Sequence, residues 1–236
     1  EYTGGVYHVC REILAPALIG KEIDSGETLQ QQFSWVAGNF FAKGGLDAAW
    51  WDLQARRQNQ PLWKLIGGTN QVIDVGADFG VQDSIDMLLG NIQGAVDTGF
   101  PRIKLKAAPG WDLEMLRAVT STFPDTTFHI DCNSGYTLDD LPFFKAIDAM
   151  GLAFIEQPLH YTDVLDHAEL ARQIETPICL DETIIGIRRT EQALSGGACE
   201  YVNIKPGRVG GLANSIAIHD ICRDAGVPVW VGGMLE

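Results

Sequence analysis

The chain has 236 residues, of which 46% are hydrophobic, and it carries a formal net charge of −14 at pH 7. This apolar content is enough for a sizeable core, so a disordered chain is excluded. The acidic balance disfavours binding to nucleic acid or to anionic membranes, and no apolar run reaches the ~18 residues of a membrane span. Five scattered cysteines without a CxxC pair argue against a disulfide framework or a zinc ribbon and predict a cytoplasmic protein.

Residues 1–70 have a helical pattern. Apolar residues recur at helical spacing over 7–19, and a longer helix is expected over 33–58, where Ala, Leu and Trp are frequent. Pro61 follows this stretch and cannot continue a helix, and a short helical turn is expected over 61–68.

From residue 72 onward, short apolar runs alternate with amphipathic segments of about one helix each, which predicts a parallel sheet with helical crossovers. The expected strands are 72–79, 102–106, 128–132, 153–156, 178–181, 201–205 and 227–231. The expected helices are 84–97, 112–122, 138–149, 164–174, 188–195 and 212–225.

Seven strands are one fewer than a closed (β/α)₈ barrel requires, and such barrels usually take about 250 residues. The sequence also begins without an initiator methionine and ends without a closing helix. We therefore expect a TIM-type barrel truncated after its seventh strand, over 71–236. Because of the missing strand and these ends, the sequence is also expected to be a piece of a longer protein.

Five charged residues close successive predicted strands at a regular spacing. Asp131, Glu156 and Asp181 each follow the preceding charge by 25 residues, starting from Lys106, and Lys205 follows 24 residues later. In a barrel these positions are the C-terminal strand ends, where active sites lie. The spacing of the three acids alone is weak evidence for a shared site. A lysine at each end of the set argues against a chance pattern.

The chemistry of this set favours a metal site. Converging carboxylates repel one another and need a cation, and oxygen ligands suit Mg²⁺, or Mn²⁺, better than zinc. A metal-bound substrate carboxylate can stabilise the enediolate that forms when its α-proton leaves. A lysine beside a divalent cation and another lysine has a lowered pKa, so it can act as a base. Lys104 shares a strand face with Lys106, because side chains alternate along a strand.

These motifs resemble the enolase superfamily, and within it the branch of o-succinylbenzoate synthases and N-succinylamino-acid racemases. The motifs are Lys104-Leu-Lys106, Asp131-Cys-Asn133, Glu156-Gln-Pro, Asp181-Glu182 and Asn203-Ile-Lys205-Pro-Gly. Segments 43–53, 61–68, 203–211 and 232–236 are also similar to that branch, so the resemblance covers essentially the whole chain. One departure is Cys132, where an alanine or another small residue is expected after the aspartate.

The resemblance implies a capping domain over 1–70 and a role for each motif. Asp131, Glu156 and Asp181 would hold Mg²⁺, and Lys106 would be the base with Lys104 beside it. Lys205 would be the second acid/base of a racemase or a cationic stabiliser in a synthase. Other residues expected to support the ligands or contact the substrate are Asn133, Asn203, Glu182, Gly232, Gly233 and Met234.

The resemblance implies a carbon–oxygen lyase as the first choice. The synthase removes water from a hydroxylated succinyl-cyclohexadiene carboxylate to give o-succinylbenzoate, a menaquinone precursor. The racemase inverts the α-carbon of an N-succinylamino acid with the same lysines. The expected partner is a small-molecule carboxylate, and a homo-oligomer is compatible with the sequence, which leaves the oligomeric state open.

Other interpretations of single features stay open at this stage. The glycine-rich segment 207–211 precedes a helix and resembles a phosphate-binding loop, although a plain turn is favoured. A barrel that binds a phosphorylated metabolite there is therefore a third hypothesis, and a non-catalytic metal-binding relative is a fourth. The histidines show no metal-ligand spacing, and His129 fits a buried structural role better.

Overall fold

The computed structural model describes residues 2–70 and 72–234. Its elements divide between two compact units. The first consists of the described residues of 1–71, 184–191 and 203–236, and the second of residues 72–183 and 192–202. No helix in the described ranges has the length and apolar character needed to cross a membrane.

The first unit begins with helices, as the sequence predicts for 1–70. These are α1 (Thr3–Val9), a π-helical turn (Cys10–Leu14), α2 (Gly26–Gln32), α3 (Phe40–Arg57) and α4 (Leu62–Leu65). The predicted helix over 33–58 is too long at its start, because Gly38 and Asn39 both adopt positive φ angles immediately before α3. Leu14, Leu29 and Phe33 are fully buried and form the centre of this helical core.

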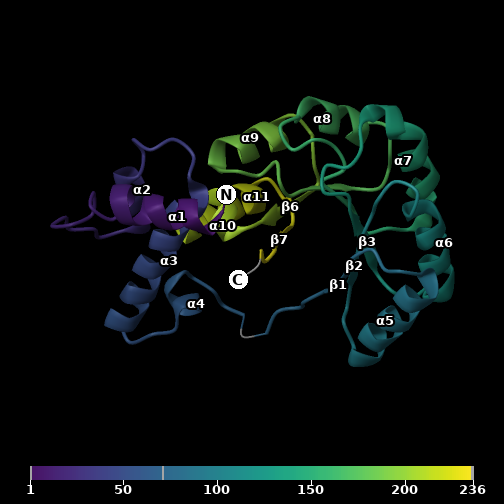
Figure 1. The fold of residues 1–236 in the computed structure, drawn as a ribbon, viewed down its shortest axis with the longest axis horizontal. Coiled ribbons are helices and arrows are strands. Elements are labelled where there is room, and N and C mark those ends of the chain that lie inside the picture. The colour runs from purple at the N-terminus through teal and green to yellow at the C-terminus, as the bar shows by residue number, and fades with distance from the viewer. Residues whose placement is uncertain (1, 71, 235–236) are drawn as a thin grey trace. The chain divides into compact units, whose positions relative to one another are not determined.

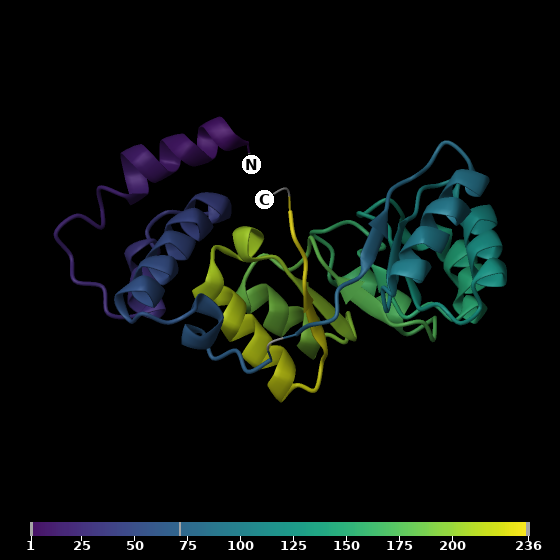
Figure 2. The ribbon, with the colours of Figure 1, turned by 90° about the horizontal axis from the view of Figure 1, so that it is seen from below.

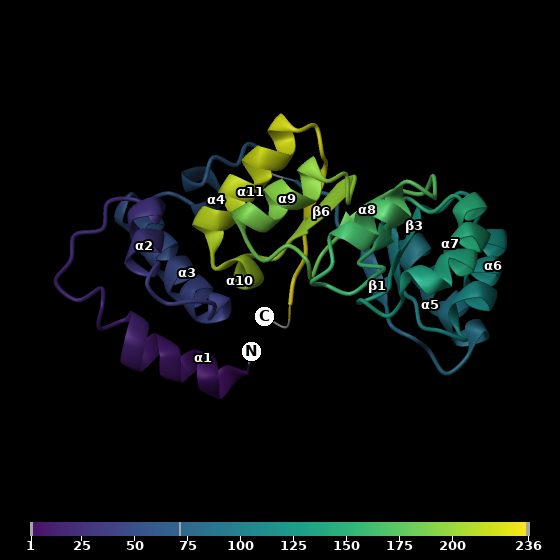
Figure 3. The same ribbon diagram turned by 90° about the horizontal axis from the view of Figure 1, so that it is seen from above.

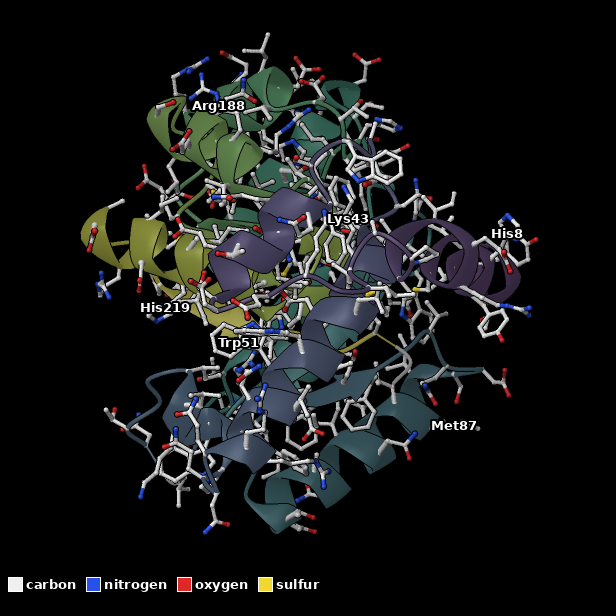
Figure 4. The ribbon with its side chains drawn as sticks, turned by 90° about the vertical axis from the view of Figure 1, so that its left-hand side faces the viewer. His8, Lys43, Trp51, Met87, Arg188 and His219 are labelled. Atoms are coloured by element: carbon white, nitrogen blue, oxygen red, sulfur yellow. The ribbon has the colours of Figure 1, made fainter. Side chains whose placement is uncertain are left out.

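The other elements of the first unit follow the barrel strands. They include α10 (Pro206–Val209), α11 (Leu212–Asp224) and β7 (Val229–Val231), the last of which follows α11 in Figure 2. A Cβ at Gly26, the first residue of α2, would lie 2.8 Å from Cζ2 of Trp51 and 3.0 Å from Cβ of Ala213. Trp51 is on α3 (Figure 4) and Ala213 is on α11, so these three helices meet closely at a glycine.

The second unit carries the strand–helix alternation. Its elements are β1 (Ala77–Phe79), α5 (Ile85–Thr98), β2 (Ile103–Lys106), α6 (Asp112–Thr122), β3 (Phe128–Asp131), α7 (Leu141–Ile147), β4 (Ile155–Glu156), α8 (Leu165–Ala171) and β5 (Ile178–Leu180). Two 3₁₀ turns, Leu138–Asp140 and Asp148–Met150, flank α7. Helices α5, α6 and α7 lie along one side of β1 to β3 (Figures 1 and 3). Helix α9 (Ile187–Ser195) and strand β6 (Tyr201–Ile204) each contain residues of both units.

The seven strands form one sheet in sequence order, β1 to β7. The five strand pairs from β1–β2 to β5–β6 are parallel. This order confirms the predicted α/β fold, a (β/α) barrel type with seven strands preceded by helices. The first strand is shorter than the predicted 72–79, because only residues 77–79 align with β2 and the side chains of Val72 and Ile73 are exposed.

Candidate active site

The charged residues lie at the C-terminal ends of the strands, as the spacing predicts. Lys106 is the last residue of β2, Asp131 of β3 and Glu156 of β4. The parallel register places Lys106 opposite Asp131 and Asp131 opposite Glu156. Neighbouring strands in a sheet are about 4.8 Å apart, so this register brings the three side chains together on one edge.

Asp181 extends this row on the next strand. Glu156 is opposite Cys179, and Asp181 lies two residues further along the chain, directly after the end of β5. The Asp181 side chain is fully buried, and its backbone N–H donates to Oε1 of Gln157 over 3.0 Å. Asp181 therefore follows directly after its strand, as the spacing of the charged residues predicts.

Lys104 forms a buried ion-pair bridge between two of the acids. Its Nζ lies 2.7 Å from Asp131 Oδ2 and 3.1 Å from Glu156 Oε2, and its side chain is only 8% exposed. Burial by itself lowers the pKa of Lys104, but Glu156 and Asp131 outweigh it and hold this pKa above its usual value. Lys104 therefore keeps its positive charge between the two carboxylates, and the lowered pKa expected for a lysine beside a divalent cation stays a prediction.

Lys106 differs from Lys104 in its access to solvent. Its side chain is 31% exposed, and its Nζ donates to Asp131 Oδ2 and to Asn133 Oδ1, both over 2.6 Å. Asn133 Nδ2 in turn donates to Glu182 Oε1 over 2.8 Å. Asn133 holds this position with a positive φ of 43°, which is uncommon for a residue with a side chain and is concentrated at functional sites. Asn133 thus bonds the Lys106 ammonium directly, and Glu182 is linked to it through Asn133.

The donor set fits a divalent cation. Four carboxyl groups lie at this end of the sheet, and only two ammonium groups, those of Lys104 and Lys106, offset their charge. The four acids are Asp131, Glu156, Asp181 and Glu182. Glu182 Oε2 is buried and has no hydrogen-bond partner within the described ranges, and burial followed by the charge of Asp181 raises the pKa of this carboxyl. The excess of negative charge and the oxygen-only donors suit Mg²⁺ or Mn²⁺.

The carboxylates are not already arranged as a ready-made ligand cluster. Among the described residues, no group of three or more His, Cys, Asp or Glu side chains is placed to hold a metal ion. The ammonium of Lys104 lies between Asp131 and Glu156 instead. Cation binding by the three predicted ligands therefore stays a prediction.

Lys205 belongs to the first unit, together with Asn203 and Gly232. Lys205 directly follows β6 and is the N-cap residue of α10, with its side chain half-buried. Asn203 is fully buried, and its Oδ1 accepts the N–H of Gly232 over 3.0 Å. A Cβ on residue 232 would lie 2.6 Å from that oxygen and 2.9 Å from Lys205 Cε, so only glycine permits this approach. Convergence of Lys205 with the acidic residues stays a prediction.

Gly233 and Met234 are exposed, and the Met234 Sδ lies 3.8 Å from Arg208 Nη2. Contact of either residue with a substrate stays a prediction. His129 is fully buried, in agreement with the structural role expected for it.

The structure argues against a phosphate-binding loop at 207–211. The first N–H of α11, on Leu212, donates to Asp47 Oδ1 over 2.5 Å. A negatively charged side chain already satisfies the helix terminus that would attract a phosphate. The glycines of this segment instead permit close packing of α3.

The structure also shows contacts of Gln157, Gln30 and Asp47, to which the sequence analysis assigned no role. Gln157 is fully buried, and its Oε1 accepts the N–H groups of Asp181 and Thr183, each over 3.0 Å. Gln157 also has a positive φ of 41°, which the sequence does not reveal. Gln30 and Asp47 contact the segment after Lys205, and residues so distant along the chain give no local signal.

The comparisons with known proteins agree with this arrangement. Residues 2–67 match the family of mandelate racemase / muconate lactonizing enzyme N-terminal domains, and residues 88–236 match the enolase C-terminal domain-like family. An o-succinylbenzoate synthase from Geobacillus kaustophilus is 45% identical over 230 residues, which cover 98% of this chain and 61% of the relative. An N-succinylamino acid racemase from Thermus thermophilus is 40% identical over 236 residues, which cover 100% of this chain and 64% of the relative.

Solved structures lead to the same family. A crystal structure of an enolase-superfamily member from Listeria innocua superposes with a TM-score of 0.96 at 38% identity, covering 100% of this chain and 64% of the other. The chain thus spans less than two thirds of the length of these relatives. With both family matches in chain order and the charged strand ends in register, the chain belongs to the enolase superfamily.

Proposed function

We propose that the protein is an o-succinylbenzoate synthase, a hydro-lyase that removes water from a hydroxylated succinyl-cyclohexadiene carboxylate. The observation that carries the proposal is the pair of lysines on β2, which differ in their surroundings. Lys106 is accessible and hydrogen-bonded to Asp131 and Asn133, whereas Lys104 is buried between two acids. Relatives named o-succinylbenzoate synthase, at 45% and 44% identity over 230 residues, support the choice of reaction.

In this proposal Asp131, Glu156 and Asp181 hold Mg²⁺, for which Mn²⁺ would be a substitute. The bound cation would offset the negative charge that builds up on the substrate carboxylate. A structural neighbour at 21% identity is described with bound magnesium, which is a statement about that racemase and not about this chain.

Lys106 acts as the base. Its amine takes the α-proton, and the electron pair of the broken C–H bond passes toward the substrate carboxylate. This electron pair then returns to form a C=C bond while the C–O bond of the hydroxyl group breaks, and the departing oxygen takes a proton from the Lys106 ammonium and leaves as water. Asn133 and Asp131 fix the direction of Nζ, since both accept hydrogen bonds from it. The buried Lys104 keeps its charge and orients the carboxylates.

Lys205 supplies a positive charge to the developing anion in the synthase. An N-succinylamino acid racemase is the alternative, because relatives with that name match the whole chain at 40% and 43% identity. There Lys205 would donate or remove a proton on the side of the α-carbon opposite Lys106. Either activity implies a small carboxylate as the partner, and the synthase implies a cytoplasmic role in menaquinone biosynthesis.

Dehydration and α-hydrogen exchange assays with Mg²⁺ test the proposal. A synthase forms o-succinylbenzoate, whereas a racemase incorporates deuterium from D₂O into both enantiomers of an N-succinylamino acid. Lys106→Ala should lower either activity by at least about 100-fold, as expected for removal of a general base. Lys145→Ala, at an exposed position on α7, is the matched control. Magnesium binding with neither activity would reject both functions.

A further inference from the structure

Helix α3 packs directly on the segment that follows Lys205. A Cβ on Gly207 would lie 3.0 Å from the Phe41 ring, and a Cβ on Gly44 would lie 3.3 Å from the Gly207 Cα. A Cβ on Gly211 would lie 2.3 Å from Asp47 Cγ. Phe41, Gly44 and Asp47 are three residues apart on α3, so a single face of this helix covers the glycine-rich segment.

Asp47 replaces the missing cap of α11. The N-cap residue of this helix is Gly211, which has no side chain to accept the first N–H groups. Asp47 Oδ1 accepts the N–H of Leu212 over 2.5 Å, and its side chain is fully buried. An N-terminal helix thus provides, from 165 positions away in the sequence, the acceptor that normally comes from the preceding residue.

Gln30 of α2 contacts both Asp47 and the glycine-rich segment. Its Nε2 donates to Asp47 Oδ2 and to the carbonyl of Gly210, both over 2.9 Å. The carbonyl of Lys205 accepts the N–H of Arg208 over 2.9 Å, and the carbonyl of Pro206 accepts that of Gly211 over 2.8 Å. The backbone from Lys205 to Leu212, which includes α10, is therefore hydrogen-bonded internally, and α2 and α3 hold its far end.

We propose that Asp47, oriented by Gln30, is a positioning residue for Lys205. It touches no reacting atom in this proposal. It holds the segment 205–212 in place. The position of the Lys205 backbone, and therefore of its side-chain ammonium, depends on that segment. The inference rests on the proposed function, because it assigns a task to the catalytic Lys205 of that function.

Amide hydrogen exchange tests whether Asp47 holds the segment 206–213, and it requires no catalytic activity. In Asp47→Asn, one acceptor oxygen remains for Leu212, but the charge is lost and an amide faces Gln30. We expect amides of 206–213 to exchange roughly tenfold faster, as loss of a helix cap implies. Gln30→Met, which removes the donor at similar size, should act in the same direction. Asp52→Asn is the control, since Asp52 is exposed on the same helix and pairs with Arg56.

A double-mutant cycle tests the link to Lys205. For whichever reaction the full chain catalyses, Asp47→Asn should lower kcat about tenfold with KM nearly unchanged, whereas Asp52→Asn leaves both unchanged. In a Lys205→Arg background, Asp47→Asn should change kcat less than about twofold, because coupled residues are not additive. A merely destabilising substitution would lower kcat equally in both backgrounds.

The outcomes separate the two proposals. Equal kcat losses in both backgrounds, or exchange of 206–213 no faster than in Asp52→Asn, would overturn the positioning role. A wild-type chain that catalyses neither dehydration nor α-hydrogen exchange would instead overturn the proposed function. In that case the amide exchange alone decides whether Asp47 holds the segment.

Discussion

The Lys104 ammonium lies 2.7 Å from Asp131 Oδ2, although the register places Lys104 opposite His129 rather than Asp131. The lysine side chain therefore extends toward the C-terminal end of the sheet, where it also contacts Glu156. Both carboxylates are fully buried, so this ammonium offsets charges that would be costly to leave alone in the protein interior.

Removal of this ammonium should destabilise the protein in the absence of a divalent cation. For Lys104→Met we expect the free energy of unfolding to fall by about 3–5 kcal/mol, the usual cost of leaving a buried charge without its partner. Mg²⁺ should restore more stability to this variant than to the wild type, because the cation then meets uncompensated carboxylates. Chemical denaturation with and without Mg²⁺ measures both effects.

Lys145→Met is the control for this experiment, since Lys145 is exposed. Equal Mg²⁺ effects on the wild type and Lys104→Met would contradict the expected competition between ammonium and cation.

Gln157 should control the affinity for the cation through Asp181. Its Oε1 accepts the N–H groups of Asp181 and Thr183, and its Nε2 donates to Thr183 Oγ1 over 2.8 Å. Gln157→Met keeps the size but removes these bonds, and we expect Mg²⁺ affinity to fall by about 10–100-fold. Titration calorimetry checks this. Gln173→Met, on the surface, should leave the affinity unchanged, and an unchanged affinity in Gln157→Met would show that the amide does not orient Asp181.

A side chain at residue 232 should destabilise the protein. In Gly232→Ala the methyl group would meet Asn203 Oδ1 at 2.6 Å and Lys205 Cε at 2.9 Å, so one of them must move. We expect a loss of about 1–3 kcal/mol in unfolding free energy, as for other overpacked sites, together with a lower kcat. Gly45→Ala on α3 meets open space and should be neutral or stabilising. Thermal unfolding and steady-state kinetics measure the two effects. A Gly232→Ala variant as stable and active as the wild type would contradict the close contact of Gly232 with Asn203 and Lys205.

Acid should destabilise the fold partly through two buried histidines. Burial, with Arg102 and Lys104, lowers the pKa of His129 to about 3, and burial also lowers that of His167. The unfolded chain binds a proton at each near pH 6.5, so their contribution to stability is complete above that pH and is lost as the pH falls toward the folded pKa.

Denaturation at several pH values measures this contribution. His129→Gln should reduce the slope of unfolding free energy between pH 6 and 4 by up to about 1.4 kcal/mol per pH unit. Equal slopes in wild type and His129→Gln would mean that His129 takes up its proton in the folded protein as readily as in the unfolded one.

The sequence by itself determined the order of the strands and the charged residues that end β2, β3 and β4. Apolar runs of strand length end at Lys106, Asp131 and Glu156, and the structure ends β2, β3 and β4 at these residues. Such boundaries are local properties, since side-chain alternation and turn residues are read within a few positions. The local pattern failed where backbone conformation decided, as at Gly38 and Asn39, which delay the start of α3.

Tertiary structure alone decided which groups hold the site together. Asp47 caps a helix 165 positions away, and Gln157 bonds the backbone of the next strand. Neither contact leaves a trace in spacing or periodicity, because it depends on two distant segments being packed together. The direction of the Lys104 pKa was decided in the same way, since burial and two carboxylates act on it only after the strands align.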